Sequence, residues 1–250
     1  MIRGIYTAAA GLATATLRLG VVSNNVANAT TPGYKQDRLP EELGRALDLR
    51  RWAVDVQGRP VGTITLGPQV GVSELDLGAG PMQETASPLD LAIAGDGFFA
   101  VQGADGQTRY TRDGGFRRDA DGALRTRTGA AVLSDAGQPI RLPEGEVAVA
   151  ADGTLLVDGA VTARVSIVQF APGQQLTKVG NGQFEAAAGA APRPATAVQV
   201  YQGYLEGSNV DMTESMVATM GLVRAYEANQ RLLQIQDETL KSAVNEVGRA

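Results

Sequence analysis

The chain has 250 residues with a formal net charge of −5 at pH 7, and it contains no cysteine and no histidine. These counts exclude disulfides, zinc–thiolate sites and catalysis by cysteine or histidine, so an enzyme with this sequence would have to use carboxylates, lysine or tyrosine. The acidic balance, without a run of lysine or arginine, argues against nucleic acid or an anionic membrane as a partner. Because there are 31 glycines and only 5% aromatic residues, we expect an aliphatic core built from short strands and many turns.

The first segment is predicted to be a helix with one apolar stripe. The stripe recurs at spacings of three and four, the period of a coiled coil, and consists of Ile2, Ile5, Ala9, Leu12, Thr16, Leu19, Ser23 and Val26. Arg3 before an alanine-rich stretch imitates a secretory signal, but Thr14 and Arg18 interrupt the uniformly apolar core that a signal needs. We therefore expect no signal cleavage. No other segment approaches the about 20 apolar residues that span a bilayer, so membrane insertion is not expected.

The end of this helix, SNNVANATTPGYK (Ser23 to Lys35), carries three asparagines. Asn24 and Asn28 are four residues apart and share one helical face, where buried amides would fix register and partner choice. A fraying helix end, where asparagine is common, explains the same pattern equally well. Thr31-Pro32-Gly33 then predicts a turn, because proline sets one backbone angle and glycine allows a positive one.

Residues 36–80 are predicted to be an extended connector. Pro40-Glu41-Glu42-Leu43 can open a short helix that runs to Trp52. Beyond it, repeated glycine and proline favour extended chain. Trp52, the only tryptophan, is expected to be an anchor in a small core or an interface.

The middle of the chain alternates between short apolar runs and turn residues, which predicts antiparallel strands. The expected strands are 89–94, 98–102, 123–127, 147–150, 154–157, 165–170 and 198–205. Asp-Gly pairs, which supply the positive backbone angles of tight turns, lie between the apolar runs. They begin at Asp96, Asp105, Asp113, Asp121, Asp152 and Asp158. Residues 186–197, with two prolines, are expected to form an exposed loop.

The last segment is predicted to be the longest helix. Asp211 with Glu214 three residues later is typical of a helix start, where side chains satisfy free backbone N–H groups. The seam positions repeat by three and four at Leu222, Tyr226, Asn229, Leu233, Gln236, Leu240, Ala243 and Val247. A helix from Asp211 to Val247 would reach about 55 Å, more than a domain of this mass needs for its own core. Part of it is therefore expected to meet another chain.

No catalytic, cofactor or metal site is predicted. Asp119-Ala120-Asp121-Gly122 resembles the opening of a calcium loop, but the later ligands are missing and a hairpin turn is the better interpretation. Tyr110-Thr111-Arg112-Asp113-Gly114 is compact and polar, and a strand that runs into a hairpin explains it. The many carboxylates lie on predicted turns, so no pair is selected for acid–base work.

Both ends of the chain resemble the flagellar rod and hook proteins of bacteria. SNNVANATTPGYK resembles the N-terminal signature of that family, and EGSNVDMTESMVATMGLVRAYEANQRLLQIQDETL (Glu206 to Leu240) resembles its C-terminal signature. PLDLAIAGDGFFAVQ and YTRDGGFRRDADGALRT resemble the segment shared by proximal-rod, distal-rod and hook subunits. The length is that of a rod subunit, and GPMQETASPLDLAI and LPEGEVAVAADGTL slightly favour the proximal rod over the distal rod.

The resemblance implies an α+β subunit in which long N- and C-terminal helices form a coiled-coil-like inner core around which a β-rich part packs. Its expected segments are 1–35 (helix and Thr-Pro-Gly turn), 36–80 (connector), 81–205 (β-rich domain) and 206–250 (C-terminal helix). Such subunits stack helically into a hollow shaft that transmits motor torque to the hook. Physically, two distant apolar stripes would repay the cost of ordering only on stacking, so we expect frayed termini in the monomer.

The resemblance also implies partners and a location. The partners are other copies of the chain, neighbouring rod and hook subunits, the flagellar export apparatus and the ring proteins that surround the rod. The location is the basal body in the cell envelope, in the periplasm where an outer membrane exists, reached without a cleaved signal peptide. The expected assembly residues are Ile5, Leu12, Leu19, Asn24, Asn25, Asn28, Thr31, Pro32, Gly33, Asn209, Leu222, Arg224, Tyr226, Asn229, Leu233 and Leu240.

Two other functions fit parts of the sequence. A secreted β-rich adhesin or binding module would use the strands but would leave the two terminal stripes unexplained. A cell-wall polysaccharide hydrolase would need two carboxyl groups in one cleft, about 5 to 10 Å apart.

Overall fold

The structure, a computed structural model, describes residues 2–43, 46–53, 56–65, 68–171, 176–187, 189–196 and 198–247. The chain divides into two compact units. Unit 1 comprises Met1–Ala27, Asp37–Asp76 and Asp211–Ala250, and unit 2 comprises Asn28–Gln36 and Leu77–Val210. The chain therefore crosses between the units four times.

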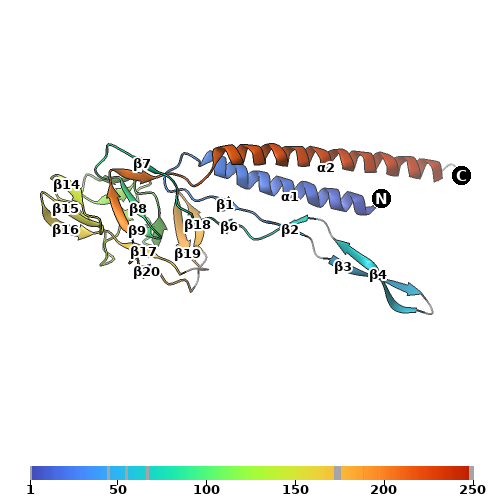
Figure 1. Cartoon of the computed structure of the whole chain (residues 1–250), viewed down its shortest axis with the longest axis horizontal. Helices are drawn as coiled ribbons and strands as arrows, with labels where there is room; N and C mark the ends of the chain where they lie inside the picture. Colours follow the sequence, from blue (N-terminus) through green and yellow to red (C-terminus); the bar gives the residue numbers. More distant parts are fainter. Residues whose placement is uncertain are drawn as a thin grey trace. The chain divides into compact units, whose positions relative to one another are not determined.

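Unit 1 is built around two long helices, α1 (Ile2–Ala27) and α2 (Met212–Val247), which confirm the two predicted helices. They lie side by side and run antiparallel (Figure 1). Asp211 Oδ1 accepts a hydrogen bond from the Glu214 backbone N–H at 3.0 Å, so the predicted cap is confirmed at the start of α2. Asp237 and Lys241 form an ion pair of 2.7 Å on the exposed surface of this helix.

Residues Gly4–Ala27 of α1 have the length and the mean hydropathy, 1.4, of a membrane span. Length and composition alone do not separate such a span from a helix that buries its apolar side in protein, as this one does in part against α2.

The rest of unit 1 consists of antiparallel strand pairs. β1 (Asp37–Arg38) pairs with β6 (Glu74–Leu75), β2 (Glu41–Leu43) with β5 (Pro68–Val70), and β3 (Ala46–Ala53) with β4 (Val56–Thr65). The expected short helix from Pro40 to Trp52 is therefore wrong. The paired residues from Glu41 to Arg51 find strand partners 8 to 29 residues later, for example Glu41 opposite Val70, and such pairing overrides local helix propensity. The Trp52 side chain lies outside the described side chains.

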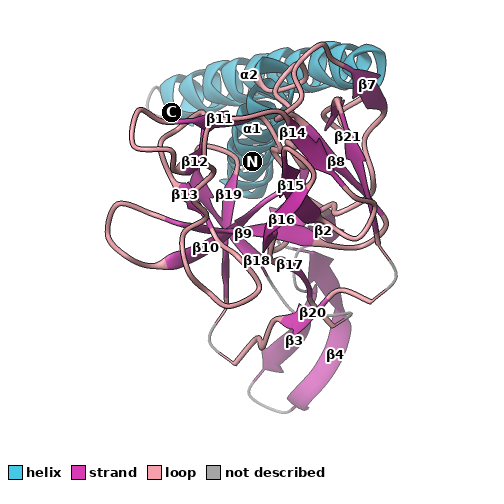
Figure 2. Ribbon diagram, turned by 90° about the vertical axis from the view of Figure 1, so that its left-hand side faces the viewer, coloured by secondary structure: helices cyan, strands magenta, loops and turns pink. Residues whose placement is uncertain are grey.

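Unit 2 contains the remaining strands, which are magenta in Figure 2 together with those of unit 1, and their pairs are antiparallel, as predicted. They are β7 (Met82–Glu84), β8 (Leu91–Ala94), β9 (Phe98–Gln102), β10 (Thr108–Thr111), β11 (Phe116–Arg118), β12 (Leu124–Thr126), β13 (Ala131–Val132), β14 (Val147–Val149), β15 (Thr154–Val157), β16 (Ala160–Arg164), β17 (Ile167–Gln169), β18 (Leu176–Gly180), β19 (Gln183–Ala186), β20 (Arg193–Pro194), β21 (Gln199–Gln202) and β22 (Tyr204–Glu206).

Strand β9 is the centre of this unit. It pairs with β10 along one edge, and with β13 and β17 along the other. Strands β14, β15 and β16 form a sheet of their own, β21 pairs with β8, and β22 pairs with β7. The last strands of the unit are thus held by its first strands.

The core of unit 2 is aliphatic, as the composition predicts. Leu91, Val101, Val132 and Leu155 are each at most 1% exposed. Phe99 packs edge-to-face on Phe116, with ring centroids 5.0 Å apart. Apolar burial on both sides of β9 therefore holds the sheet pairs together.

Four of the six predicted Asp-Gly turns have a glycine with positive φ, namely Gly106, Gly122, Gly153 and Gly159. Gly97 and Gly114 do not, so the prediction was wrong about their role. A Cβ at Gly114 would lie 1.7 Å from the Leu91 carbonyl oxygen, and one at Gly97 would lie 2.9 Å from Ile167 Cγ2. These two glycines are required by close packing rather than by backbone angle.

Candidate interaction surfaces and a buried charge cluster

Within unit 1, glycines of α1 lie against amide side chains of α2. A Cβ at Gly11 would come within 2.9 Å of Asn229 Nδ2, and one at Gly4 within 3.0 Å of Gln236 Nε2. From one contact to the other, α1 advances by seven residues and α2 goes back by seven, as two antiparallel helices require. Ala8 and Ala15 of α1 are buried. Small residues thus let the two helices approach closely.

The predicted seam residues are only partly covered. Ile5, Leu12 and Leu19 of α1 and Leu222, Asn229, Leu233 and Leu240 of α2 are half-buried, whereas Arg224 and Tyr226 are exposed. From Met212 to Asn245 no side chain is fully buried. The helices contact each other within one chain and still leave much of α2 to solvent.

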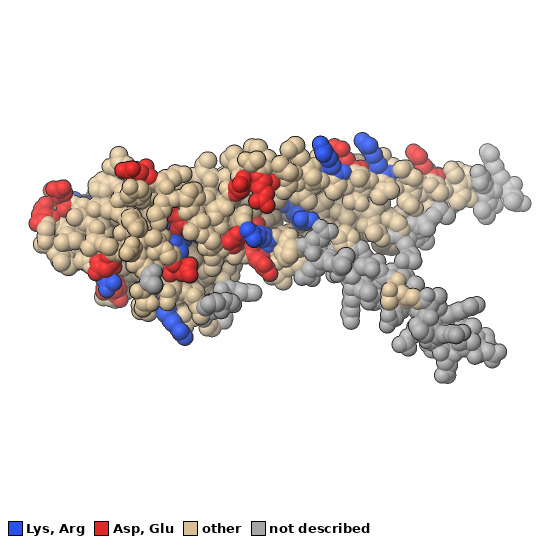
Figure 3. Space-filling model, in the orientation of Figure 1, with Lys and Arg blue, Asp and Glu red and all other residues tan. Residues whose placement is uncertain are grey.

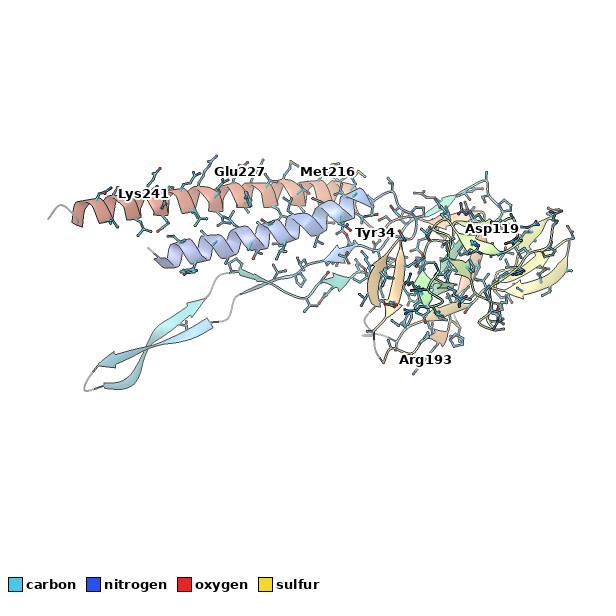
Figure 4. All side chains as sticks on the ribbon, turned by 180° about the vertical axis from the view of Figure 1, so that it is seen from behind. Tyr34, Asp119, Arg193, Met216, Glu227 and Lys241 are labelled. Carbon is cyan, nitrogen blue, oxygen red and sulfur yellow. The ribbon has the colours of Figure 1, made fainter. Side chains whose placement is uncertain are left out.

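Large apolar side chains make up part of that exposed surface. On α2 they are Met216, Val217, Met220, Leu232, Ile235 and Val244, all at least 50% exposed. Figure 4 labels Met216, Glu227 and Lys241 at intervals along α2. On α1, Tyr6 is 73% exposed and Leu17 is 57% exposed. Large contiguous apolar patches on a protein surface are typical of interaction sites.

Asn25, the buried asparagine at the end of α1, fixes the chain that follows the turn. Its Nδ2 donates to the Asp37 carbonyl oxygen at 2.8 Å, and its Oδ1 accepts from the Asp37 N–H at 3.0 Å. The amide therefore acts as a second neighbour for Asp37, which also pairs with Leu75 of β6. Asn24, by contrast, is exposed.

Asn28, Thr31, Pro32 and Gly33 form the predicted turn in unit 2. The Thr31 N–H donates to the Asn28 carbonyl oxygen at 3.1 Å, and Thr31 Oγ1 lies 3.3 Å from Asn28 Oδ1. Gly33 has φ of 66°, as predicted, and its N–H donates to the Glu206 carbonyl oxygen at 2.7 Å. Pro32 is half-buried.

Asn209 binds the same segment from the other end of unit 2. Its Oδ1 accepts from the Gln36 N–H at 2.8 Å, and its Nδ2 donates to the Gly78 carbonyl oxygen at 3.3 Å. The two signature motifs, far apart in the sequence, are therefore bonded to each other within unit 2.

At the centre of these contacts lies a buried charge cluster of Lys35, Arg112 and Glu206. Lys35 Nζ lies 2.6 Å from Glu206 Oε1, and Arg112 Nη1 lies 2.9 Å from Glu206 Oε2. The three side chains are 0%, 4% and 2% exposed. The guanidinium also stacks over Phe98, with Cζ 5.2 Å from the ring centroid.

Backbone groups complete the cluster. Lys35 Nζ donates to the Gly78 carbonyl oxygen at 2.6 Å, and Arg112 donates to the carbonyl oxygens of Ile93 at 3.2 Å and Gly95 at 2.7 Å. Sequence reasoning missed this cluster, although each member stands in a motif that carries the family resemblance: TTPGYK, YTRDGG and EGSNVD. The presence of a charged residue in each of these three motifs was the sequence signal that could have indicated the cluster.

Asp113, next to the cluster, is bonded to other groups. Its Oδ1 accepts from the Gly115 N–H at 2.9 Å and lies 3.6 Å from Arg127 Nη2. Burial raises the pKa of the Asp113 carboxyl above its ordinary value, although the bond from Gly115 and the charge of Arg127 act the other way.

A pocket of about 390 Å³ beside β17 and β20 contains two carboxylates, Asp135 and Asp152. The backbone N–H of Thr154, bonded to Asp152 at 3.0 Å, lowers the pKa of that carboxyl. Asp152 is therefore held ionised and is unsuited to donate a proton, as one carboxyl of a hydrolase must. Among the described residues no group of three or more acids gathers as a metal site.

The charged side chains on the face shown in Figure 3 are scattered, with acids and bases interspersed. That view shows no continuous basic surface of the kind that binds a polyanion.

Three family models match the chain. One, described as flagella basal body rod protein, matches residues 5–35. The flagellar hook protein FlgE/F/G D1 domain matches residues 92–162, and the flagellar basal body rod FlgEFG protein C-terminal model matches residues 201–246. These matches contain the two helices that form the pair and much of unit 2.

Individual relatives align along most of their length. The flagellar basal-body rod protein FlgF of Caulobacter vibrioides is 35% identical over 234 residues, which cover 92% of each chain. FlgF of Escherichia coli is 35% identical over 254 residues, or 95% of each chain. The rod protein FlgG of Bacillus subtilis is 29% identical over 262 residues, covering 98% of this chain and 99% of its own.

Proposed function

Because the chain belongs to the family of flagellar basal-body rod proteins, we propose that it polymerises helically through its terminal helices into the hollow shaft that transmits motor torque to the hook. As a rod protein it is a structural component of the basal body and serves motility. The observation that carries the proposal is the exposed apolar surface on both helices of one chain. Repeated head-to-tail burial of that surface between copies would generate an open helical assembly.

The proximal rod is the position that we favour. The FlgF relatives of Caulobacter vibrioides and Escherichia coli are 35% identical to the chain, and FlgG of Bacillus subtilis is 29% identical. The FlgF type is the proximal kind in the family, so the higher identity supports the proximal rod. Neighbouring rod and hook subunits, the export apparatus and the surrounding rings are the proposed partners.

The helices are proposed to gain order on stacking and to line the inside of the shaft as a coiled-coil tube. They contact each other within one chain, but α2 buries no side chain completely between Met212 and Asn245. Amide exchange on dilute monomer should therefore be fast in α1 and α2 and slow in β9. Strong protection of both helices at low concentration would contradict ordering that depends on assembly.

The decisive experiment places a charge on the exposed apolar surface of α2. Leu232 is 50% exposed, so Leu232→Glu should leave the monomer fold intact and prevent shaft formation. Gln230→Glu, at an exposed position of the same helix, adds the same charge and serves as control. Each variant replaces the chromosomal gene, swimming is scored, and basal bodies are imaged. Normal rods with Leu232→Glu would contradict the proposal that this surface of α2 is buried between copies.

A second variant tests the asparagine-rich turn. Asn28→Leu should preserve the β content of the monomer but disturb assembly, while Gln107→Leu in the exposed hairpin after β9 should do neither. Unchanged swimming and normal shafts with Asn28→Leu would count against an assembly role for this turn. Export without a cleaved signal peptide stays a prediction. Determining the N-terminal residue of the subunit in isolated basal bodies tests it.

A further inference from the structure

Glu206 joins two buried cations that come from distant parts of unit 2. Lys35 belongs to the segment that enters the unit after α1, and it is 171 residues away from Glu206 in the sequence. Arg112 follows β10 and is 94 residues away. Glu206 is the last residue of β22. The cluster forms only when the beginning, the middle and the end of the unit meet.

Both positive charges of the cluster contact the Glu206 carboxylate, Lys35 at Oε1 and Arg112 at Oε2. Both cations are at most 4% exposed, so each has exchanged water for protein groups. Carbonyl oxygens of Gly78, Ile93 and Gly95 bind them, but carbonyl dipoles do not neutralise a full charge. Within the described residues, the buried Arg112 Nε has no hydrogen-bond partner. The carboxylate is therefore what makes burial of both cations tolerable.

The same residue also closes the backbone of the unit. The Glu206 carbonyl oxygen accepts from the Gly33 N–H at 2.7 Å, and Glu206 Oε1 accepts from the Gly80 N–H at 3.0 Å. Strand β22 pairs with β7 beside these contacts. A chain is synthesised from its N-terminus, so Lys35 and Arg112 are present long before Glu206.

We propose that Glu206 is an electrostatic latch for unit 2. The unit closes over Lys35 and Arg112 only when the last strand brings the carboxylate, so an incomplete chain keeps this unit open. The proposal concerns folding of the single chain and is independent of the proposed assembly function.

The test uses the full-length chain with Glu206→Gln, Lys35→Met and both changes together. Unfolding in urea is monitored through the amide exchange of peptides from β9, because these peptides report on unit 2. Glu206→Gln should lower the folding equilibrium constant by about 100-fold or more, because it removes the carboxylate that both buried cations contact. Lys35→Met should lower it in the native background. In the Glu206→Gln background the same change should instead raise it, because it removes a buried cation whose partner at position 206 no longer carries a charge.

This reversal of sign separates the latch from a merely structural contact. If Lys35→Met lowers the equilibrium constant in both backgrounds, the cluster acts by packing and hydrogen bonding, and the proposal is wrong. If Glu206→Gln does not fold at all, gain of protected β9 amides in the double variant supports the latch, and no gain overturns it. Glu144→Gln, which alters a carboxylate that is 96% exposed, should leave the constant unchanged.

Discussion

Gly11 of α1 lies so close to Asn229 of α2 that a Cβ at Gly11 would come within 2.9 Å of Asn229 Nδ2 and 3.0 Å of Oδ1. That amide also donates to the Ala225 carbonyl oxygen at 3.0 Å, so it cannot move without losing a bond. Replacing glycine by alanine inside a helix usually stabilises it by about 1 kcal/mol. At Gly11 the overlap with Asn229 should cancel this gain, and the helix pair should become less stable than the native one by about 1 kcal/mol. Thermal unfolding followed by circular dichroism at 222 nm measures the difference.

Gly20→Ala is the matched control, because a Cβ there meets nothing within 4 Å and the helix should become more stable. The double variant Gly11→Ala/Asn229→Ala removes both the overlap and its cause. It should recover most of the stability lost in Gly11→Ala. Equal melting of the Gly11→Ala and Gly20→Ala proteins would show that the contact is unimportant.

Gly33 is a position in unit 2 where an added methyl group meets both a strained backbone angle and a collision with backbone atoms. Its φ is 66°, and a Cβ would lie 2.3 Å from the Asp113 backbone nitrogen and 2.4 Å from the Arg112 carbonyl carbon. Backbone atoms cannot rotate away, so the segment that carries Lys35 would have to shift. Gly33→Ala should cost about 3 kcal/mol or more of unfolding free energy, as judged by urea unfolding.

Gly106→Ala is the control that separates backbone strain at positive φ from the collision of the added Cβ with neighbouring atoms. Gly106 has φ of 78°, but a Cβ there meets nothing within 4 Å. It should cost only about 1 kcal/mol, the price of the left-handed conformation. Similar losses at both positions would mean that the close approach at Gly33 contributes nothing.

The elements that the sequence predicts correctly are those with a local signal. A repeat of three and four residues is enough to identify α1 and α2, and short apolar runs between Asp-Gly pairs identify strands such as β9 and β15. The helix expected after Pro40 failed because β2 and β3 are defined by partners in β5 and β4, which no local pattern encodes.

The buried charge cluster was hidden for a related reason. Lys35, Arg112 and Glu206 are far apart in the sequence, and a charged residue taken alone is expected to be solvated. By contrast, the surplus length of the last helix predicts that part of it meets another chain, which stays a prediction; α2 has no fully buried side chain from Met212 to Asn245.

Asn25 is predicted to hold the start of β1 through both ends of its amide. Asn25→Ala removes the two bonds to Asp37, of 2.8 and 3.0 Å, and should cost about 1 to 3 kcal/mol. Asn25→Asp keeps the acceptor for the Asp37 N–H, but it turns a carboxylate oxygen toward the Asp37 carbonyl oxygen. This variant should therefore lose at least as much stability as Asn25→Ala. Exchange of the Asp37 amide, measured by NMR, reports the effect directly. Ser23→Ala, at an exposed position two residues earlier, should leave that amide protected.

Asp113 and Asp119 are predicted to affect the pH dependence of stability in opposite directions. Burial raises the pKa of Asp113 in the folded state, so this group stabilises the fold below its ordinary pKa, and that contribution is lost as pH rises through the raised value. Asp113→Asn keeps an acceptor for the Gly115 N–H and does not titrate. The variant should therefore gain stability over the native protein at neutral pH, and the gain should disappear in acid.

The Ala120 backbone N–H, bonded at 2.8 Å, lowers the pKa of Asp119 in the folded state. Its contribution is present above the ordinary pKa and is lost as pH falls through the lowered value, so Asp119→Asn should be less stable than the native protein at neutral pH. Urea unfolding from pH 3 to pH 7 measures both differences against the native curve, which cancels the other carboxylates. A loss of stability at neutral pH in Asp113→Asn would mean that the 3.6 Å pair with Arg127 outweighs the cost of burying the charge. Since the Arg127 side chain is 51% exposed, solvent should screen that pair, and the gain is the expected outcome.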